Sequence, residues 1–329
     1  MMGCTRWLSS FLLLAISSGA TFAQDDEPHA GVVVSPGFEP TVWITRGTVK
    51  VVLSPESGAR VLEYSVAGKN AMWFDEKERT PEPGKPRPIS AGRFDIGPEL
   101  TIAAHPELWS GKWTAEITSN SSAQLTSQRD EKLGVQLRRV FQLNEDGSLS
   151  CKQLITNISA NTQEFCHWGR SFSPGGGICL VPLFGQSRFP SKYAMYEDSA
   201  IINVRNTDEK IRERDGFLEI LAPPRKPKLG FDSYAGWLAY VMPGDVLFVK
   251  RYWVYPNRVY NEAAGLTLSV WYPAGPRIEL EPIGPRERLQ PQQTASFTER
   301  WYLLSHPFPK EGEQIDLKKL REQVEDLWR

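Results

Sequence analysis

Histidine and cysteine are scarce in this chain of 329 residues, which has four of each. No cysteines have the C-x-x-C spacing and no histidines are paired, so a zinc site is not indicated. The run Gly175-Gly176-Gly177 is not followed by Lys-Ser or Lys-Thr, which a phosphate-binding loop requires. Gly169-Arg170-Ser171 begins like a serine-hydrolase elbow, but Ser173 stands where the second glycine belongs. The classes of function that remain are acid–base catalysis by histidine and carboxylates, and ligand binding without catalysis.

The chain also has no excess of charge of one sign. Lys and Arg number 38 against 39 Asp and Glu, and the basic residues are scattered rather than striped. Nucleic acid and anionic membranes are therefore not expected partners. Beyond the first residues, no apolar run is long enough to cross a bilayer, so no membrane span is expected.

The first residues have the pattern of an export signal. Arg6 gives a positive start, Leu8 to Ile16 form an apolar stretch, and Ala20 to Ala23 form a small-residue exit before Gln24. We expect a signal peptide over residues 1–23 and a secreted or periplasmic protein.

Three cysteines follow the signal: Cys151, Cys166 and Cys179. An oxidising compartment permits one disulfide and one free thiol, with Cys151 and Cys166 bridging neighbouring strands. The alternative is three small buried hydrophobic residues. The sequence does not decide between them.

Strand patterns dominate the chain and predict an all-β fold, a β-sandwich closed by a C-terminal helix. We expect a flexible lead-in over 24–40, a β-domain over 41–306 and a helix within 307–329. Two charged, proline-containing segments, Glu76 to Ala91 and Asn203 to Gly230, are expected to be loops. The predicted strands are 48–53, 60–66, 237–241, 246–252, 266–271, 277–281 and 295–304. The helix is predicted from an apolar stripe of Ile315, Leu320, Val324 and Leu327.

The clearest hairpin runs from Val135 to Asn157. Apolar residues occupy alternate positions, and Asn144 to Gly147 supply the turn. Arg139 and Gln153 are polar residues at two of the alternate positions that are expected to face inward. Polar groups on an inner face can line a binding groove, although strand ends that face water give the same pattern.

A histidine and a pair of glutamates are the leading candidates for acid–base chemistry. His167 follows a predicted strand, and a histidine titrates near neutrality. Glu279 and Glu281 alternate along one late strand, so both point to the same face. If that face lines a cavity, a carboxylate and a histidine on opposite sides of a sugar ring can interconvert its anomers. If it faces solvent, such glutamates are ordinary.

Aromatic residues provide the second signal. Eleven tryptophans are present, and His105 lies in a loop beside Trp109 and Trp113. Trp168 and Arg170 follow His167. Flat rings stack on sugar faces while charged groups fix the hydroxyls, so this combination suits carbohydrate recognition. A large β-core uses aromatic residues just as heavily.

A spaced set of patches resembles the galactose mutarotase/aldose 1-epimerase superfamily, and more narrowly an uncharacterised exported bacterial branch of it. The patches are Gly58 to Ser65, Val140 to Asn157, His167-Trp168, Glu279 to Pro282 and Leu289-Gln290-Pro291. They spread over roughly Gly47 to Leu304, and their order carries the resemblance.

The resemblance implies a β-supersandwich with a concave face that binds carbohydrate. It also implies that His167 is the acid that protonates the ring oxygen and that Glu281 is the base at the anomeric hydroxyl. His105 matches an earlier sugar-binding histidine. Separately from the resemblance, we expect Trp109, Trp168, Arg170 and Glu279 to contact the substrate. No cofactor and no metal are implied.

The sequence departs from the superfamily pattern around these positions. His167 is followed by Trp168-Gly169-Arg170 rather than an aromatic-Phe-Asn-Leu stretch, and Glu281 is followed by Pro282-Ile283. Two functions therefore stay open: an aldose 1-epimerase working through His167 and Glu281, and a non-catalytic module that binds mono- or oligosaccharides on the same face.

Overall fold

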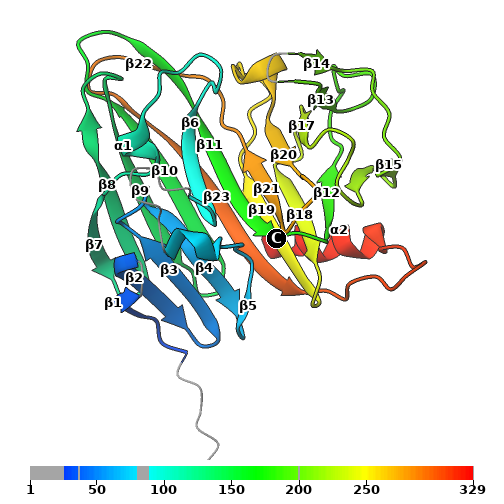
Figure 1. Ribbon diagram of the computed structural model, residues 1–329, viewed down its shortest axis with the longest axis horizontal. Helices are drawn as coiled ribbons and strands as arrows, with labels where there is room; N and C mark the ends of the chain where they lie inside the picture. The colour runs from blue at the N-terminus through cyan, green and yellow to red at the C-terminus, as the bar shows by residue number, and fades with distance from the viewer. Residues whose placement is uncertain (1–25, 36–37, 80–88, 199–200, 329) are drawn as a thin grey trace, which may run out of the picture.

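The computed structural model describes residues 26–35, 38–79, 89–198 and 201–328, so the expected signal peptide lies outside the described residues. Two antiparallel β-sheets stack face to face and bury one continuous apolar core between them (Figure 1). This confirms the all-β sandwich with a C-terminal helix that the strand patterns predict.

The sheet with more strands, called the large sheet, has the spatial order β1-β2-β3-β4-β6-β11-β21-β20-β17-β13-β14, with β5 paired to β4 and β22 to β11. Its strands are β1 (His29–Ser35), β2 (Phe38–Arg46), β3 (Val49–Ser54), β4 (Arg60–Val66), β5 (Lys69–Asn70), β6 (Gly92–Gly97), β11 (Gln163–Pro174), β13 (Ala194–Tyr196), β14 (Ile202–Asn203), β17 (Lys228–Phe231), β20 (Leu268–Trp271), β21 (Arg277–Pro282) and β22 (Glu287–Leu289).

The other sheet, called the small sheet, has the order β15-β16-β12-β18-β19-β23-β10-β9-β8-β7. Its strands are β7 (Thr114–Ser119), β8 (Ser122–Asp130), β9 (Val135–Leu143), β10 (Leu149–Asn157), β12 (Ile178–Pro182), β15 (Ile211–Arg214), β16 (Phe217–Ile220), β18 (Trp237–Met242), β19 (Val246–Tyr252) and β23 (Thr294–Ser305).

The expected hairpin is confirmed as β9 and β10, which pair in one unbroken register. Gly147 in its turn has φ +76°, a conformation that glycine adopts without strain. Arg139 and Gln153 face each other across the pair and are buried between the sheets, where they border a cavity of about 10 Å³ rather than an open groove. The Arg139 guanidinium donates to the carbonyl of Phe94 at 2.8 Å and packs on Trp113 at 4.4 Å, which satisfies it inside the core.

The C-terminal helix is shorter than its predicted range. Helix α2 spans Leu317–Glu325 and continues into a 3₁₀ turn, η3 (Asp326–Trp328), whereas 307–316 is not helical. The side chain of Asp316 accepts a hydrogen bond from the Lys319 amide at 3.0 Å and caps the helix. Leu320 and Val324 pack on the outer face of the small sheet, against residues such as Val249.

Two expectations about loops are wrong. The lead-in over 24–40 was expected to be flexible, but strand β1 and the start of β2 pair there. The segment from Asn203 to Gly230 contains β15, β16 and β17, which were not predicted because strands of 4 residues show little periodicity. The loop expected from Glu76 includes η1 (Glu76–Arg79), and residues 80–88 lie outside the described residues. The remaining helical turns are α1 (Pro106–Trp109) and η2 (Ala263–Gly265).

The three cysteines are buried and unbonded, so the disulfide alternative is not realised. Helices in the described part of the chain are all too short or too polar to cross a membrane.

Candidate functional site

The outer face of the large sheet carries a compact cluster of charged and aromatic side chains. Five neighbouring strands, β6, β11, β21, β20 and β17, lie side by side there. Alternate residues of a strand point to opposite faces, and the inward-pointing residues, such as Phe94, Leu280 and Val270, belong to the core. The outward-pointing set is therefore Arg93, Asp95, Trp168, Arg170, Phe172, Glu279, Glu281, Trp271 and Lys228.

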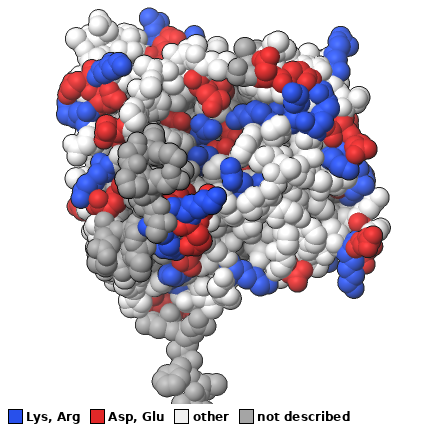
Figure 2. All heavy atoms as spheres, viewed as in Figure 1, with Lys and Arg blue, Asp and Glu red and all other residues white. Residues whose placement is uncertain are grey.

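A cavity of about 770 Å³ opens over this cluster, and we call it the large-sheet cavity. Its residues come from the sheet and from loops: Arg93, Glu99, Leu100, Arg170, Phe172, Tyr196, Glu197, Asp198, Lys226, Pro227, Lys228, Trp271 and Glu279. Figure 2 shows acidic and basic side chains intermixed over this side of the molecule, with neither sign forming a large separate patch. The cavity therefore offers paired charges and ring faces rather than a field of one sign.

Glu279 is the centre of the charged network. Its carboxylate accepts hydrogen bonds from the guanidinium of Arg93 and from Nε of Arg170, the latter at 3.0 Å. Burial raises the pKa of Glu279, but the two guanidinium groups outweigh it and hold the pKa below its usual value. Nη1 of Arg170 also lies 3.4 Å from both Asp95 and Glu99. Glu279 is thus a fixed anion held by two cations.

Glu281 has a different environment on the same strand. The Trp168 indole donates to Oε2 at 2.9 Å, and the Lys228 ammonium lies 2.7 and 3.0 Å from the two carboxylate oxygens. Burial, together with the negative charge of Glu279, raises the pKa of Glu281 above its usual value, although Lys228 opposes this. Glu281 is 0% exposed and does not line the cavity, whereas the Lys228 side chain is 16% exposed and does. Lys228 therefore stands between Glu281 and the cavity.

His105 and Trp109 join the cluster from the loop around α1. Nε2 of His105 lies 2.8 Å from Asp95, and Nδ1 lies 2.7 Å from the carbonyl of Ala103, which can only accept a hydrogen bond. Burial lowers the pKa of His105, but Asp95 more than compensates and raises it. The Trp109 ring lies 5.3 Å from the Arg170 guanidinium, within cation–π distance.

His167 lies apart from this cluster. It alternates with Trp168 on β11 and therefore points the other way, into the space between the sheets. Its ring stacks on Phe297 with the centroids 5.9 Å apart, and burial lowers the pKa of His167 to about 3. The structure does not bring His167 and Glu281 together, which corrects the expectation that they face one another across a sugar.

The other residues predicted to contact a sugar are also divided between the outer face of the large sheet and the core. Glu279, Glu281, Trp168, Arg170, His105 and Trp109 share the outer face, whereas Trp113 is in the core. Trp168 is 1% exposed beneath Lys228 and Arg170, so its ring face is covered.

The sequence reading missed Arg93, Asp95, Lys228, Tyr196 and Trp271. Arg93 and Asp95 alternate around a core phenylalanine in β6, and this short alternation was an available signal. Lys228 begins β17, inside a stretch that reads as a loop. Among the described residues, no three His, Cys, Asp or Glu side chains are grouped so that they could hold a metal ion.

Solved structures match this architecture over most of their length. A galactose mutarotase-like protein from Lactobacillus casei has a TM-score of 0.56 at 13% identity, covering 80% of this chain and 100% of its own. A galactose mutarotase related enzyme from Lactobacillus acidophilus has a TM-score of 0.55 at 12% identity, covering 84% of this chain and 98% of its own. A galactose mutarotase-like protein from Clostridium acetobutylicum has a TM-score of 0.54 at 12% identity, with coverages of 85% and 99%.

Sequence comparison adds nothing further, because no family model matches the chain and no curated protein matches it significantly. At these low identities the likeness is one of architecture. The chain has the galactose mutarotase-like fold, as the resemblance in its sequence implies.

Proposed function

We propose that the protein binds an uncharged carbohydrate in the large-sheet cavity. The observation that carries this proposal is the network of Arg93, Glu279 and Arg170 beside the rings of Phe172 and Trp271. Guanidinium N–H groups and a carboxylate fixed in one geometry suit the donor and acceptor pattern of neighbouring sugar hydroxyls. The adjacent, half-buried ring of Trp271 suits the apolar face of a pyranose.

The charge balance of the cavity favours a neutral ligand. Four basic residues, Arg93, Arg170, Lys226 and Lys228, face four acidic residues, Glu99, Glu197, Asp198 and Glu279. A strongly anionic or cationic ligand would gain as much repulsion as attraction from such a lining.

The stacking residues differ from those expected from the sequence. Trp168 and Trp113 are covered, so Trp271, which is half-buried and lines the cavity, takes the role of the ring platform. Tyr196 adds a hydroxyl at the cavity wall, and burial raises its pKa, so it stays protonated and able to donate.

Anomer interconversion is a second candidate function, favoured by the Glu281–Lys228 pair. A carboxylate with a raised pKa is a suitable base near neutrality. Glu281 takes the proton from the anomeric hydroxyl while the Lys228 ammonium gives one to the ring oxygen, and the bond between C1 and the ring oxygen breaks. After rotation about the C1–C2 bond, the ring oxygen attacks the other face of the aldehyde, and both protons return. Lys228 replaces His167 as the acid, and it must leave Glu281 for the sugar to reach the carboxylate.

Ligand-observed NMR on the mature protein tests both functions in one sample. With glucose, galactose, cellobiose and lactose, we expect saturation transfer to at least one sugar and about tenfold weaker binding by Trp271→Ala. If none of a broad panel of neutral sugars binds, the proposal of carbohydrate binding is rejected.

The same spectra report α/β exchange. If the protein is an epimerase, the wild type accelerates exchange and Glu281→Gln does not, although it still binds. Exchange that is unchanged in Glu281→Gln would remove Glu281 from the mechanism. Binding without acceleration would leave the non-catalytic function.

We further propose that the protein works outside the cytoplasm, on the basis of the export pattern over residues 1–23. Mass spectrometry of protein expressed in a bacterial host should find an N-terminus at Gln24, and a retained leader in a cytoplasmic fraction would contradict export.

A further inference from the structure

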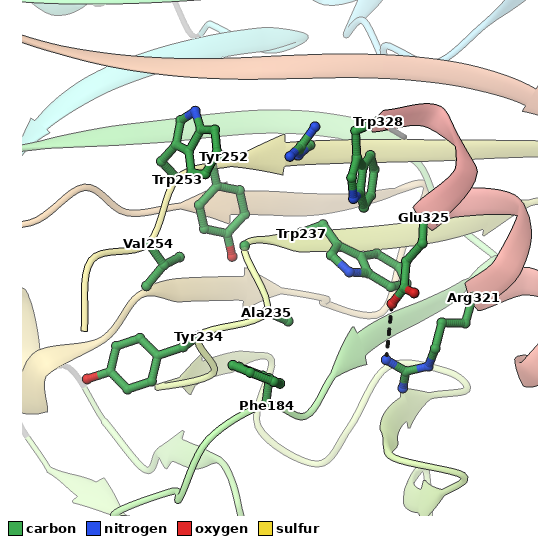
Figure 3. Close-up of a pocket in the computed structure, with 12 residues that line it drawn as sticks. Phe184, Tyr234, Ala235, Trp237, Tyr252, Trp253, Val254, Arg321, Glu325 and Trp328 are labelled. Carbon is green, nitrogen blue, oxygen red and sulfur yellow. Dashed lines mark ion pairs between the residues drawn. The ribbon is translucent and has the colours of Figure 1, made fainter.

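A second pocket lies on the opposite side of the molecule, at the outer face of the small sheet beside the C-terminal helix. Its volume is about 510 Å³, and we call it the helix pocket. Figure 3 shows Trp253 and Tyr252 at the end of β19, Trp237 on β18 and Trp328 at the end of the helical segment, all around one hollow. It shares no lining residue with the large-sheet cavity.

The lining of the helix pocket is rich in aromatic rings. Six of its twelve residues are aromatic, and none is Leu, Ile or Met. Two of the rings are exposed to solvent, Trp253 at 65% and Phe184 at 66%. Broad aromatic faces held at the edge of a hollow, with few aliphatic side chains, suit the stacking of a flat, partly apolar ligand such as a sugar ring.

One cation in this pocket has no anionic partner. The Arg251 guanidinium lies 4.3 Å from the centroid of the Trp328 ring and 5.4 Å from that of Trp253. Among the described residues no carboxylate forms an ion pair with Arg251, whereas the neighbouring Arg321 lies 3.7 Å from Glu325. The two indole faces order the guanidinium, the Tyr302 hydroxyl interacts with it, and its other N–H groups are open to a ligand.

We propose that the helix pocket binds an anionic saccharide, with a sugar ring stacked on Trp253 and a carboxylate or sulfate group on Arg251. A planar guanidinium pairs with either group through two parallel hydrogen bonds. Because the pocket and the large-sheet cavity are built from different sheets, this proposal is independent of the proposed function.

Calorimetric titration of the full mature chain with trigalacturonate tests the proposal, with galactotriose as the neutral match and a sulfated trisaccharide as the second anionic probe. We expect an anionic sugar to bind and the neutral one to bind at least about tenfold more weakly. Trp253→Ala and Arg251→Gln should each weaken anionic binding about tenfold, and added salt should weaken it further. Phe184→Ala tests, in the same titration, whether the second exposed ring of the pocket contributes to binding.

Trp271→Ala is the matched control, since it removes a ring from the large-sheet cavity and should leave anionic binding unchanged. The proposal is overturned if neither anionic sugar binds, if Trp253→Ala and Arg251→Gln bind as the wild type does, or if Trp271→Ala abolishes binding. It is also overturned if sedimentation reveals self-association that depends on Trp253 while no sugar binds, because the pocket would then be a protein interface.

Discussion

The large-sheet cavity and the helix pocket differ in the environments of their arginine and tryptophan side chains. In the large-sheet cavity, Arg93 and Arg170 are neutralised by Glu279, and Trp168 is covered. In the helix pocket, Arg251 has no acidic partner within the described part of the chain, and Trp253 is exposed. Paired charges give a rigid, selective surface, and removing one charge of a pair destabilises the fold. An unpaired cation on exposed rings gives a surface that can be altered at little structural cost.

Arg93→Met should produce the largest effect within the charged network of the large-sheet cavity. It leaves Glu279 buried with only one of its two guanidinium partners, and breaking a buried ion pair typically costs about 3–5 kcal/mol. We expect a loss near the lower end, about 3 kcal/mol, because Arg170 remains. Urea unfolding measures it, and a loss under about 1 kcal/mol would show that the network contributes little to stability.

Leu320→Ala should affect binding in the helix pocket and in the large-sheet cavity differently. Leu320 is fully buried between α2 and the small sheet, and truncating such a leucine costs about 2–5 kcal/mol. The loosened helix also carries Arg321 and Glu325, with Trp328 just beyond it, so anionic saccharide binding should weaken. Neutral sugar binding in the large-sheet cavity should persist at a temperature where the variant is folded. Equal loss at both sites would indicate that they are coupled.

His105 should give a smaller, pH-dependent effect. Asp95 raises the pKa of His105 in the folded state above its unfolded value, so the stabilisation is fully present below the unfolded pKa and is lost as the pH rises through the folded pKa. The stability difference between wild type and His105→Gln should therefore be larger at pH 5.5 than at pH 9. A difference that is constant with pH would mean that the pKa of His105 is the same in the folded and unfolded states.

Trp253→Ala should have the smallest effect on the fold. The side chain is largely exposed, so the free energy of unfolding should change by less than about 0.5 kcal/mol. Thermal unfolding measures this, and a large loss would show that the ring is structural rather than available to a ligand.

Sequence periodicity was sufficient for strands with one polar and one apolar face or with clear turns. The β9–β10 hairpin follows from alternation, and the shared face of Glu279 and Glu281 follows from their spacing. Periodicity failed on β11, where residues on both faces are buried, so the pattern could not show that His167 points inward and Trp168 outward.

The partners of the site residues could not be predicted for a different reason. Lys228 meets Glu281 only because β17 lies next to β20 and β20 next to β21, an order that arises from long-range pairing. Arg93 reaches Glu279 across β11 in the same way. Nothing local in the sequence encodes these neighbours.

The position of Lys228 gives the protein an intrinsic optical reporter. Its ammonium lies 5.0 Å from the centroid of the Trp168 ring, and the same indole donates to the carboxylate that holds this ammonium. A ligand that draws Lys228 away changes the electric field across one buried fluorophore. The emission maximum of Trp168 should therefore move when the cavity fills, so occupancy can be followed without a label.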